Sequence, residues 1–202
     1  MNNPPRLILA GLSGGAGKTI ISLGLTRALK RHGLSVKAFK KGPDYIDSTW
    51  LGLAAGNGAS NLDPFLMPKA KVLGLFDEKS QGCDIAVIEG NRGLFDGKDV
   101  QGSCSTSELA RQLQCPVVLI LDATKMTRTA AAIVKGCKDF EEYHLAGVIL
   151  NRTAGERHRA MLRESIAEYA GVPVLGELPK LKDNPIPERH MGLISNREYS
   201  QT

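Results

Sequence analysis

Apolar runs alternate with segments of helical periodicity along most of this chain. Continuous apolar runs are typical of strands covered on both faces, whereas apolar positions about three to four residues apart are typical of helices packed on a sheet. The strands predicted in this way are 6–10, 35–39, 83–89, 116–122, 145–151 and a short 172–179. The predicted helices are 20–29, 72–79, 107–113, 126–140 and 156–170. Because the two types alternate, the sequence predicts an α/β fold, with a mostly parallel central sheet and helices on both faces.

Two segments give weaker patterns. Residues 49–71 are rich in Gly, Asn, Pro and Ala, and we expect short helices and loops there without a definite assignment. Beyond Pro185 the chain becomes polar and its prolines are spaced apart. We therefore predict one domain over 1–185, followed over 186–202 by a closing strap or the start of a linker.

A glycine-rich segment joins the first predicted strand to the first helix. Residues 11–19 read Gly-Leu-Ser-Gly-Gly-Ala-Gly-Lys-Thr. In this strand–turn–helix context, backbone N–H groups converge on an oligophosphate, Lys18 would reach the outer phosphates, and the Thr19 hydroxyl would ligate Mg²⁺. The strict pattern has glycine where this chain has Leu12, so this is a variant phosphate-binding loop (P-loop). The alternative is a glycine-rich turn with an incidental lysine. The nucleotide-binding residues predicted here are Ser13, Gly14, Gly15, Ala16, Gly17, Lys18 and Thr19.

Charged residues also gather where the second and third predicted strands end. Residues 40–47 read Lys-Lys-Gly-Pro-Asp-Tyr-Ile-Asp, at the edge where open α/β sheets bind their ligands. One helical turn would put Asp44 and Asp47 on the same side, so we favour a functional role over a solvated acidic turn. The third strand ends in Glu89, which fits the Walker B pattern of an acid that holds Mg²⁺ directly or through water.

Two further segments are candidates for contact with a ligand. The glycine-rich stretch 90–97 would let the backbone approach a ligand closely. Residues 102–106 are rich in hydroxyl groups at the start of a predicted helix, where N-capping is at least as good an explanation as ligand contact.

Composition narrows the function classes only a little. The formal net charge of +5 comes from scattered basic residues interleaved with acids, so a nucleic-acid partner is not expected. No apolar run approaches the roughly 20 residues of a membrane span, and the N-terminus lacks the layout of a signal peptide. We therefore expect a cytoplasmic protein without a membrane partner. The cysteines and histidines lack metal-ligand spacing, which disfavours a zinc site or a disulfide framework.

Several motifs together resemble cobyrinic acid a,c-diamide synthase. They follow the family order between Arg6 and Leu193, and they read SGGAGKT, FKKGPDYID, NLDPFLM, IAVIEGNRGLFDG, STSELARQL, VVLILDATKMTRTAAAIVKG, LAGVILNR, ERHRAMLRE and IPERHMGL. The resemblance implies a P-loop NTPase fold like that of dethiobiotin synthetase. It also implies an ATP- and Mg²⁺-dependent ligase that amidates the a and c side-chain carboxylates of a corrin ring through an acyl phosphate, in cobalamin biosynthesis.

The resemblance also implies roles for particular residues. Thr19, Asp47 and Glu89 would ligate Mg²⁺, and Lys40 would join Lys18 in stabilising charge on the transferring phosphoryl group. Asp44, with Tyr45, would lie at the substrate and the γ-phosphate. Asn151 and Arg152 lie where related enzymes contact adenine, although a strand-end cap explains Asn151 equally well. The catalytic residues predicted on this basis are Lys18, Lys40, Asp44, Asp47 and Glu89.

The chain departs from the family in one large respect. Full-length members continue into a glutamine amidotransferase domain with a cysteine nucleophile, whereas this sequence stops at Thr202 and none of its cysteines lies in such a motif. The chain is then either a fragment or a stand-alone synthetase. The expected partners are a corrinoid substrate and ammonia from an amidotransferase domain or subunit, and a homodimer remains open.

Other functions remain open at this point. A related synthetase amidates nickel-sirohydrochlorin, and the loops that would choose between the two rings cannot be interpreted from sequence. The Gly-Pro-Asp-Tyr-Ile-Asp cluster disfavours dethiobiotin synthetase. MinD/ParA ATPases carry an early lysine where this chain has Ser13, which disfavours a switch ATPase. A nucleotide-binding domain that is idle in isolation is the remaining alternative.

Overall fold

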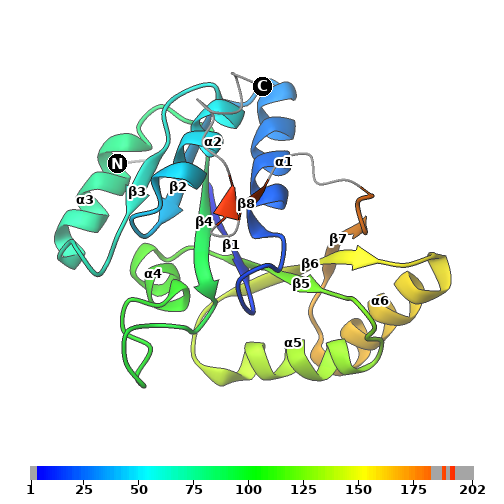
Figure 1. Cartoon of the computed structure of the whole chain (residues 1–202). Coiled ribbons are helices and arrows are strands. Elements are labelled where there is room, and N and C mark those ends of the chain that lie inside the picture. Colours follow the sequence, from blue (N-terminus) through cyan, green and yellow to red (C-terminus); the bar gives the residue numbers. More distant parts are fainter. Residues whose placement is uncertain (1–3, 183–187, 190–191, 194–202) are drawn as a thin grey trace.

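Seven parallel strands form the central sheet, in the order β3-β2-β4-β1-β5-β6-β7 (Figure 1). The computed structural model of the chain describes residues 4–182, 188–189 and 192–193. The strands of this sheet are β1 Arg6–Gly11, β2 Val36–Lys41, β3 Ser60–Leu62, β4 Ile85–Gly93, β5 Val117–Asp122, β6 Leu145–Thr153 and β7 Val174–Pro179. Two short antiparallel strands, β8 Glu188–Arg189 and β9 Gly192–Leu193, form a separate pair.

Helices cover both faces of the sheet, as the alternating pattern predicts. They are α1 Lys18–Arg31, α2 Tyr45–Ala55, α3 Lys69–Lys79, α4 Thr106–Leu113, α5 Thr129–Phe140 and α6 Glu156–Ala170. We call the side covered by α1 and α2 the α1 face, and the side covered by α3, α4, α5 and α6 the α3 face (Figure 1). Alternate strand residues divide between them: Ile8 of β1 packs into the α3-face core and Leu9 into the α1-face core. The predicted fold class is confirmed.

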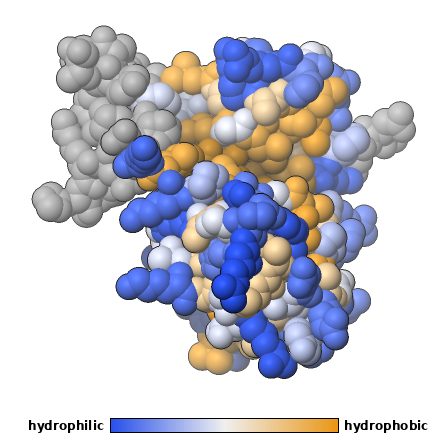
Figure 2. Space-filling view, turned by 90° about the vertical axis from the view of Figure 1, so that its right-hand side faces the viewer, coloured by the Kyte–Doolittle hydropathy of each residue, from blue (hydrophilic) through white to orange (hydrophobic). Residues whose placement is uncertain are grey.

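The hydropathy of the surface differs between the two halves of the molecule. Figure 2 shows hydrophobic residues gathering at the height of α1 and hydrophilic residues dominating the lower half, where α6 lies. Helix α6 buries Leu162, Ile166 and Ala170 on one side and exposes charged residues on the other, as expected for a helix that covers a sheet. None of the described helices combines the length and the apolar character needed to cross a bilayer.

Some predicted boundaries were wrong. The segment 49–71, left without an assignment, contains most of α2 and all of β3. The strand expected to end at Glu89 continues to Gly93, and the helix expected to begin at residue 126 begins at Thr129. Residues 183–187, 190–191 and 194–202 lie outside the described part of the chain, so the proposed strap or linker over 186–202 stays a prediction.

The strand order places one position at the centre of the fold. Strand β1 lies between β4 and β5. Strands β2, β3 and β4 lie on one side of β1, and β5, β6 and β7 lie on the other. In open α/β sheets such a switch point leaves a crevice at the carboxyl ends of the strands, where ligands bind. The glycine-rich loop follows β1 here, and the acidic residue of β4 lies beside it.

Candidate functional site

The glycine-rich loop has the backbone conformation of a phosphate cradle. Gly15 and Gly17 have φ values of 74° and 92°, in the left-handed region that glycine adopts without strain. Helix α1 begins at Lys18, its N-cap lacks a side-chain hydrogen bond, and its first turn carries no acid. The first N–H groups of the helix therefore have no competing anion within the helix, which favours an anionic ligand. The predicted loop residues lie together at this helix start.

The side chain of Lys18 is held inside the loop by a backbone contact. Its side chain is largely buried, and its ammonium donates a hydrogen bond of 2.7 Å to the carbonyl oxygen of Ser13. Burial lowers the pKa of Lys18, and the nearby Lys40 lowers it further, while Glu89 and Asp47 act in the opposite direction. A negatively charged ligand would stabilise the charged form of Lys18 against both burial and the repulsion from Lys40.

Gly17 also sets how closely the loop approaches β6. A Cβ atom at this position would lie 2.2 Å from Nδ2 of Asn151, which itself donates a 2.9 Å hydrogen bond to the carbonyl oxygen of Ala16. The Asn151 side chain therefore ties the loop to the sheet. This contact is consistent with the strand-end capping explanation, and contact with adenine stays a prediction.

Replacing Gly17 by alanine should therefore lower the free energy of unfolding. The left-handed φ and the clash with Asn151 act together, and we expect a loss of about 1–3 kcal/mol in urea unfolding. Gly24 is the matched control, because it lies within α1 and a Cβ added there would meet no atom within 4 Å. Gly24→Ala should be neutral or stabilising by about 0.5–1 kcal/mol. Equal effects of the two substitutions would contradict the assigned geometry.

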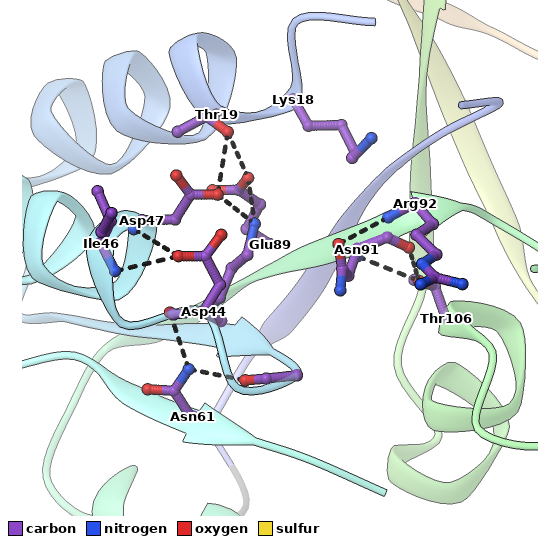
Figure 3. A network of polar contacts seen from close by, with 12 residues as sticks. Lys18, Thr19, Asp44, Ile46, Asp47, Asn61, Glu89, Asn91, Arg92 and Thr106 are labelled. Carbon is purple, nitrogen blue, oxygen red and sulfur yellow. Dashed lines mark hydrogen bonds and ion pairs between the residues drawn. The ribbon is translucent and has the colours of Figure 1, made fainter. Parts of the chain in front are cut away.

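Four side chains meet beside the loop, on the α1 face. We call Thr19, Lys40, Asp47 and Glu89 the acidic cluster; Figure 3 labels Thr19, Asp47 and Glu89. The Thr19 hydroxyl donates to Oε1 of Glu89 at 2.7 Å, and it lies 3.4 Å from Oδ2 of Asp47. The Lys40 ammonium lies 2.6 Å from Oδ2 of Asp47 and 2.8 Å from Oε1 of Glu89. The predicted metal ligands are thus brought together, with a lysine between the two carboxylates.

Strand pairing explains why Lys40 and Glu89 meet. They are direct partners in the parallel register of β2 and β4, although 49 residues separate them in the chain. Their side chains point to the same face, because Ala38 and Val87, two residues earlier on each strand, pack against the helices there. Thr19 enters from the first turn of α1, and Asp47 from the first turn of α2.

Burial shifts the pKa values of the charged groups in the acidic cluster. Burial alone would lower the pKa of Lys40, but the carboxylates of Glu89 and Asp47 outweigh it and raise the pKa, so Lys40 stays charged. Complete burial raises the pKa of Glu89, so its ionised form depends on positive charge nearby. Oε2 of Glu89 is buried and has no hydrogen-bond partner among the described residues.

The cluster fits a hard divalent cation. Hydroxyl and carboxylate oxygens are the donors that Mg²⁺ prefers, and the unpartnered Oε2 of Glu89 leaves donor capacity unused. Within the described ranges, no group of three or more His, Cys, Asp and Glu side chains could hold a metal ion. A cation here would therefore draw on Thr19 and on ligands from outside the protein, as Mg²⁺ does when it binds through phosphates and water.

Of the remaining predicted residues, Asp44 and Arg152 have structural partners of their own. Oδ1 of Asp44 accepts hydrogen bonds from the N–H groups of Ile46 and Asp47, so this carboxylate caps α2. The neighbouring Tyr45 is 71% exposed. Arg152 pairs with Asp122 at the end of β5. Substrate contact by Asp44 and Tyr45, and adenine contact by Arg152, stay predictions.

Comparison with known proteins places this chain in a family. Residues 7–194 match the family described as the CobQ/CobB/MinD/ParA nucleotide binding domain. The chain belongs to this family. A cobyrinate a,c-diamide synthase from Magnetococcus marinus is 45% identical over 195 residues, which cover 96% of this chain and 42% of that protein. A hydrogenobyrinate a,c-diamide synthase from Streptomyces coelicolor is 45% identical over 192 residues, covering 94% and 39%.

These relatives confirm the resemblance inferred from the motifs. The chain spans only about two fifths of the length of these relatives, 42% in the Magnetococcus protein. Among solved structures, the signal recognition particle receptor FtsY from Elizabethkingia anophelis aligns with a TM-score of 0.63 at 19% identity, over 86% of this chain and 58% of that chain. At this identity the likeness concerns the fold alone.

A second group of residues lies at the same edge of this domain; the sequence indicated the stretches 40–47 and 90–97 as candidates, but not that these residues lie together. Lys41 ends β2, and Asn91 and Arg92 lie in the part of β4 that continues past Glu89. The Thr106 hydroxyl donates to the carbonyl oxygen of Asn91 at 3.2 Å, and Oδ2 of Asp96 accepts from the N–H of Gly93 at 2.9 Å. The glycine-rich stretch after Glu89 was a signal, but it did not indicate that the strand continues.

The start of α4 and the cysteines offer little chemistry. Oγ of Ser105 caps α4 by accepting from the N–H of Glu108, as the capping explanation predicts. Cys83, Cys104, Cys115 and Cys137 are all free thiols. Burial raises the pKa of Cys115 to about 12 and also raises that of Cys137, so neither resembles an activated nucleophile.

Proposed function

We propose that this chain is the ATP- and Mg²⁺-dependent synthetase part of a cobyrinate a,c-diamide synthase. The observation that carries the proposal is the acidic cluster beside a P-loop, at the switch point of the sheet. The names of the relatives supply the substrate class, a corrinoid whose a and c carboxylates become amides. Because the chain covers 42% of such a relative, the activity of the whole protein is carried over as part of this proposal.

The reaction divides into two balanced steps. A substrate carboxylate oxygen attacks the γ-phosphorus of ATP, the bond to the β–γ bridging oxygen breaks, and ADP leaves with its electron pair. Ammonia then attacks the acyl carbon, the bond from that carbon to the phosphate oxygen breaks, and inorganic phosphate leaves as the nitrogen loses a proton. Both steps depend mainly on positioning and on neutralising charge.

The residues of the chain supply that positioning. The loop N–H groups and Lys18 would hold the outer phosphates, and Thr19, Asp47 and Glu89 would hold Mg²⁺, which supplies charge neutralisation at the phosphates. Lys40 is held between carboxylates that keep it protonated, so it acts as a fixed positive charge rather than as a base. Ammonia would come from an amidotransferase domain or subunit. A cytoplasmic location and a homodimer stay predictions.

The direct test measures ADP release by the purified chain with Mg-ATP and ammonium chloride, with and without cobyrinic acid. Mass spectrometry follows the ring in the same samples. We expect ADP release that depends on cobyrinic acid, together with conversion of ring carboxylates to amides. Turnover with nickel-sirohydrochlorin but not with cobyrinic acid would instead support the related synthetase. Tight ATP binding without turnover on either ring would contradict an independently active synthetase.

A further inference from the structure

One buried lysine at the sheet edge has no hydrogen-bond or ion-pair partner among the described residues. Lys18, Lys40 and Lys41 have relative exposures of 8%, 2% and 7%. Lys18 donates to Ser13, and Lys40 pairs with Asp47 and Glu89. In the part of the chain that the structure describes, the Lys41 ammonium forms neither an ion pair nor a hydrogen bond. A buried charge without a partner is costly, and such groups concentrate where a ligand of opposite charge binds.

Lys41 and Lys40 point to opposite faces of the sheet. Phe39, two residues before Lys41, packs into the α3-face core, whereas Ala38, two residues before Lys40, packs on the α1 face. The charges that act most on Lys18 are those of Lys40, Glu89, Asp47 and Asp96. Because Lys41 lies on the opposite face from Lys40 and the acidic cluster, a phosphate bound in the P-loop would leave Lys41 to another anion.

The surroundings of Lys41 carry a net positive charge. The groups that act on it are Asp63, Cys104, Arg92 and Lys40, and burial together with the last two lowers its pKa. Asp63 does not form an ion pair with it: Oδ1 of Asp63 accepts from the N–H of Phe65, and its buried Oδ2 has no hydrogen-bond partner among the described residues. Two cations, Lys41 and Arg92, therefore lie near a single carboxylate.

The backbone holds Arg92 at this place. Its φ of 53° is uncommon for a residue other than glycine, and its N–H donates to Oδ1 of Asn91 at 2.9 Å (Figure 3). The amide of Asn91 also lies against the end of β2, because a Cβ at Gly42 would be 3.2 Å from its Nδ2. The guanidinium of Arg92 has no ion-pair or hydrogen-bond partner within the described ranges.

We propose that Lys41 and Arg92 form a carboxylate-binding site that anchors a non-reacting side-chain carboxylate of the substrate. A guanidinium can bind a carboxylate through two parallel hydrogen bonds, and the arriving anion would compensate the buried ammonium. A substrate with several carboxylates needs such an anchor if one chosen group is to meet the γ-phosphate. This inference rests on the proposed function and deepens it.

The test measures equilibrium binding of cobyrinic acid to the 202-residue chain by titration calorimetry, with Mg²⁺ and a non-hydrolysable ATP analogue present. Lys41→Met should weaken cobyrinic acid binding by about 10- to 30-fold, and Arg92→Met by about 5- to 10-fold. Binding of the ATP analogue should change by less than about twofold, since among the described residues neither side chain forms a hydrogen bond or ion pair with the loop. Lys135→Met is the matched control, because this exposed lysine of α5 already pairs with Asp139.

Folding and kinetics separate the outcomes. Lys41→Met should fold at least as stably as the wild type, because methionine keeps the length and removes a buried charge. With ammonium as nitrogen source, the KM for cobyrinic acid should rise in both variants while kcat stays within about threefold. A fall in kcat with unchanged KM would overturn the anchoring role, and weaker binding of the ATP analogue would assign Lys41 to phosphate instead.

Two failures can be told apart. If the wild-type chain does not bind cobyrinic acid, the proposed function is overturned, together with the identity of this ligand. If the wild type binds it and both variants bind it equally well, only the carboxylate-binding site is overturned.

Discussion

Replacing Lys40 by methionine should lower kcat for cobyrinic acid amidation by about 10²–10³-fold. Lys40 is the fixed positive charge of the acidic cluster, 2.6 Å from Asp47 and 2.8 Å from Glu89. Charge of this kind is most valuable where negative charge develops on the transferring phosphoryl group. The affinity for ATP should change much less than turnover. Steady-state kinetics with saturating ATP and ammonium would measure the effect.

Lys40→Met also leaves Glu89 buried without its cation, which can cost about 3–5 kcal/mol of stability. The double variant Lys40→Met with Glu89→Gln removes both charges and is the matched control. We expect it to unfold in urea close to the wild-type midpoint while remaining inactive. If the double variant recovers turnover along with stability, Lys40 is structural and its assignment as a catalytic residue is wrong.

Replacing Lys18 by alanine should weaken ATP binding on the order of 100-fold, which corresponds to about 2–4 kcal/mol. Its ammonium is largely buried and is held toward the interior of the loop by Ser13, at the start of a helix with no acid in its first turn. Removing it leaves the outer phosphates without their facing charge. Titration with a fluorescent ATP analogue would measure the change.

Arg27→Ala is the control for the Lys18 substitution. Arg27 is an exposed cation on the same helix, so its removal alters the net charge equally but should leave ATP affinity within about twofold. Circular dichroism should show that both variants keep the fold. Equal ATP affinity for Lys18→Ala and the wild type would refute the P-loop assignment.

Local pattern was enough for the features that lie close together in sequence. The apolar run 6–10, the glycines of the loop and the periodic stretch 20–29 predicted the strand, the turn and the helix, although the helix begins two residues earlier, at Lys18. The acid at position 89 was also found locally, because a buried strand that ends in a carboxylate is unusual. The fold class followed from the alternation of continuous apolar runs with segments of helical periodicity. Each of these patterns reflects the faces that the element must bury.

Weak local patterns hid the elements next to the site. Helix α2 carries glycine in its interior and is apolar on most sides, so its period was not visible, and β3 has only three residues, too few for any period. Missing α2 also hid the role of Asp44, because a capping residue is recognised only when the helix after it is known.

The sequence by itself determined the P-loop, the fold class and the candidate acids of this protein. Only the tertiary structure decided that Lys40 lies between Asp47 and Glu89, because this depends on the pairing of β4 with β2. Local periodicity does not indicate the order of the strands in the sheet. It likewise decided that Lys41 lacks a partner among the described residues, since one residue along a strand reverses the face and changes every neighbour. Pairings across such sequence distances follow from global packing, which no local pattern encodes.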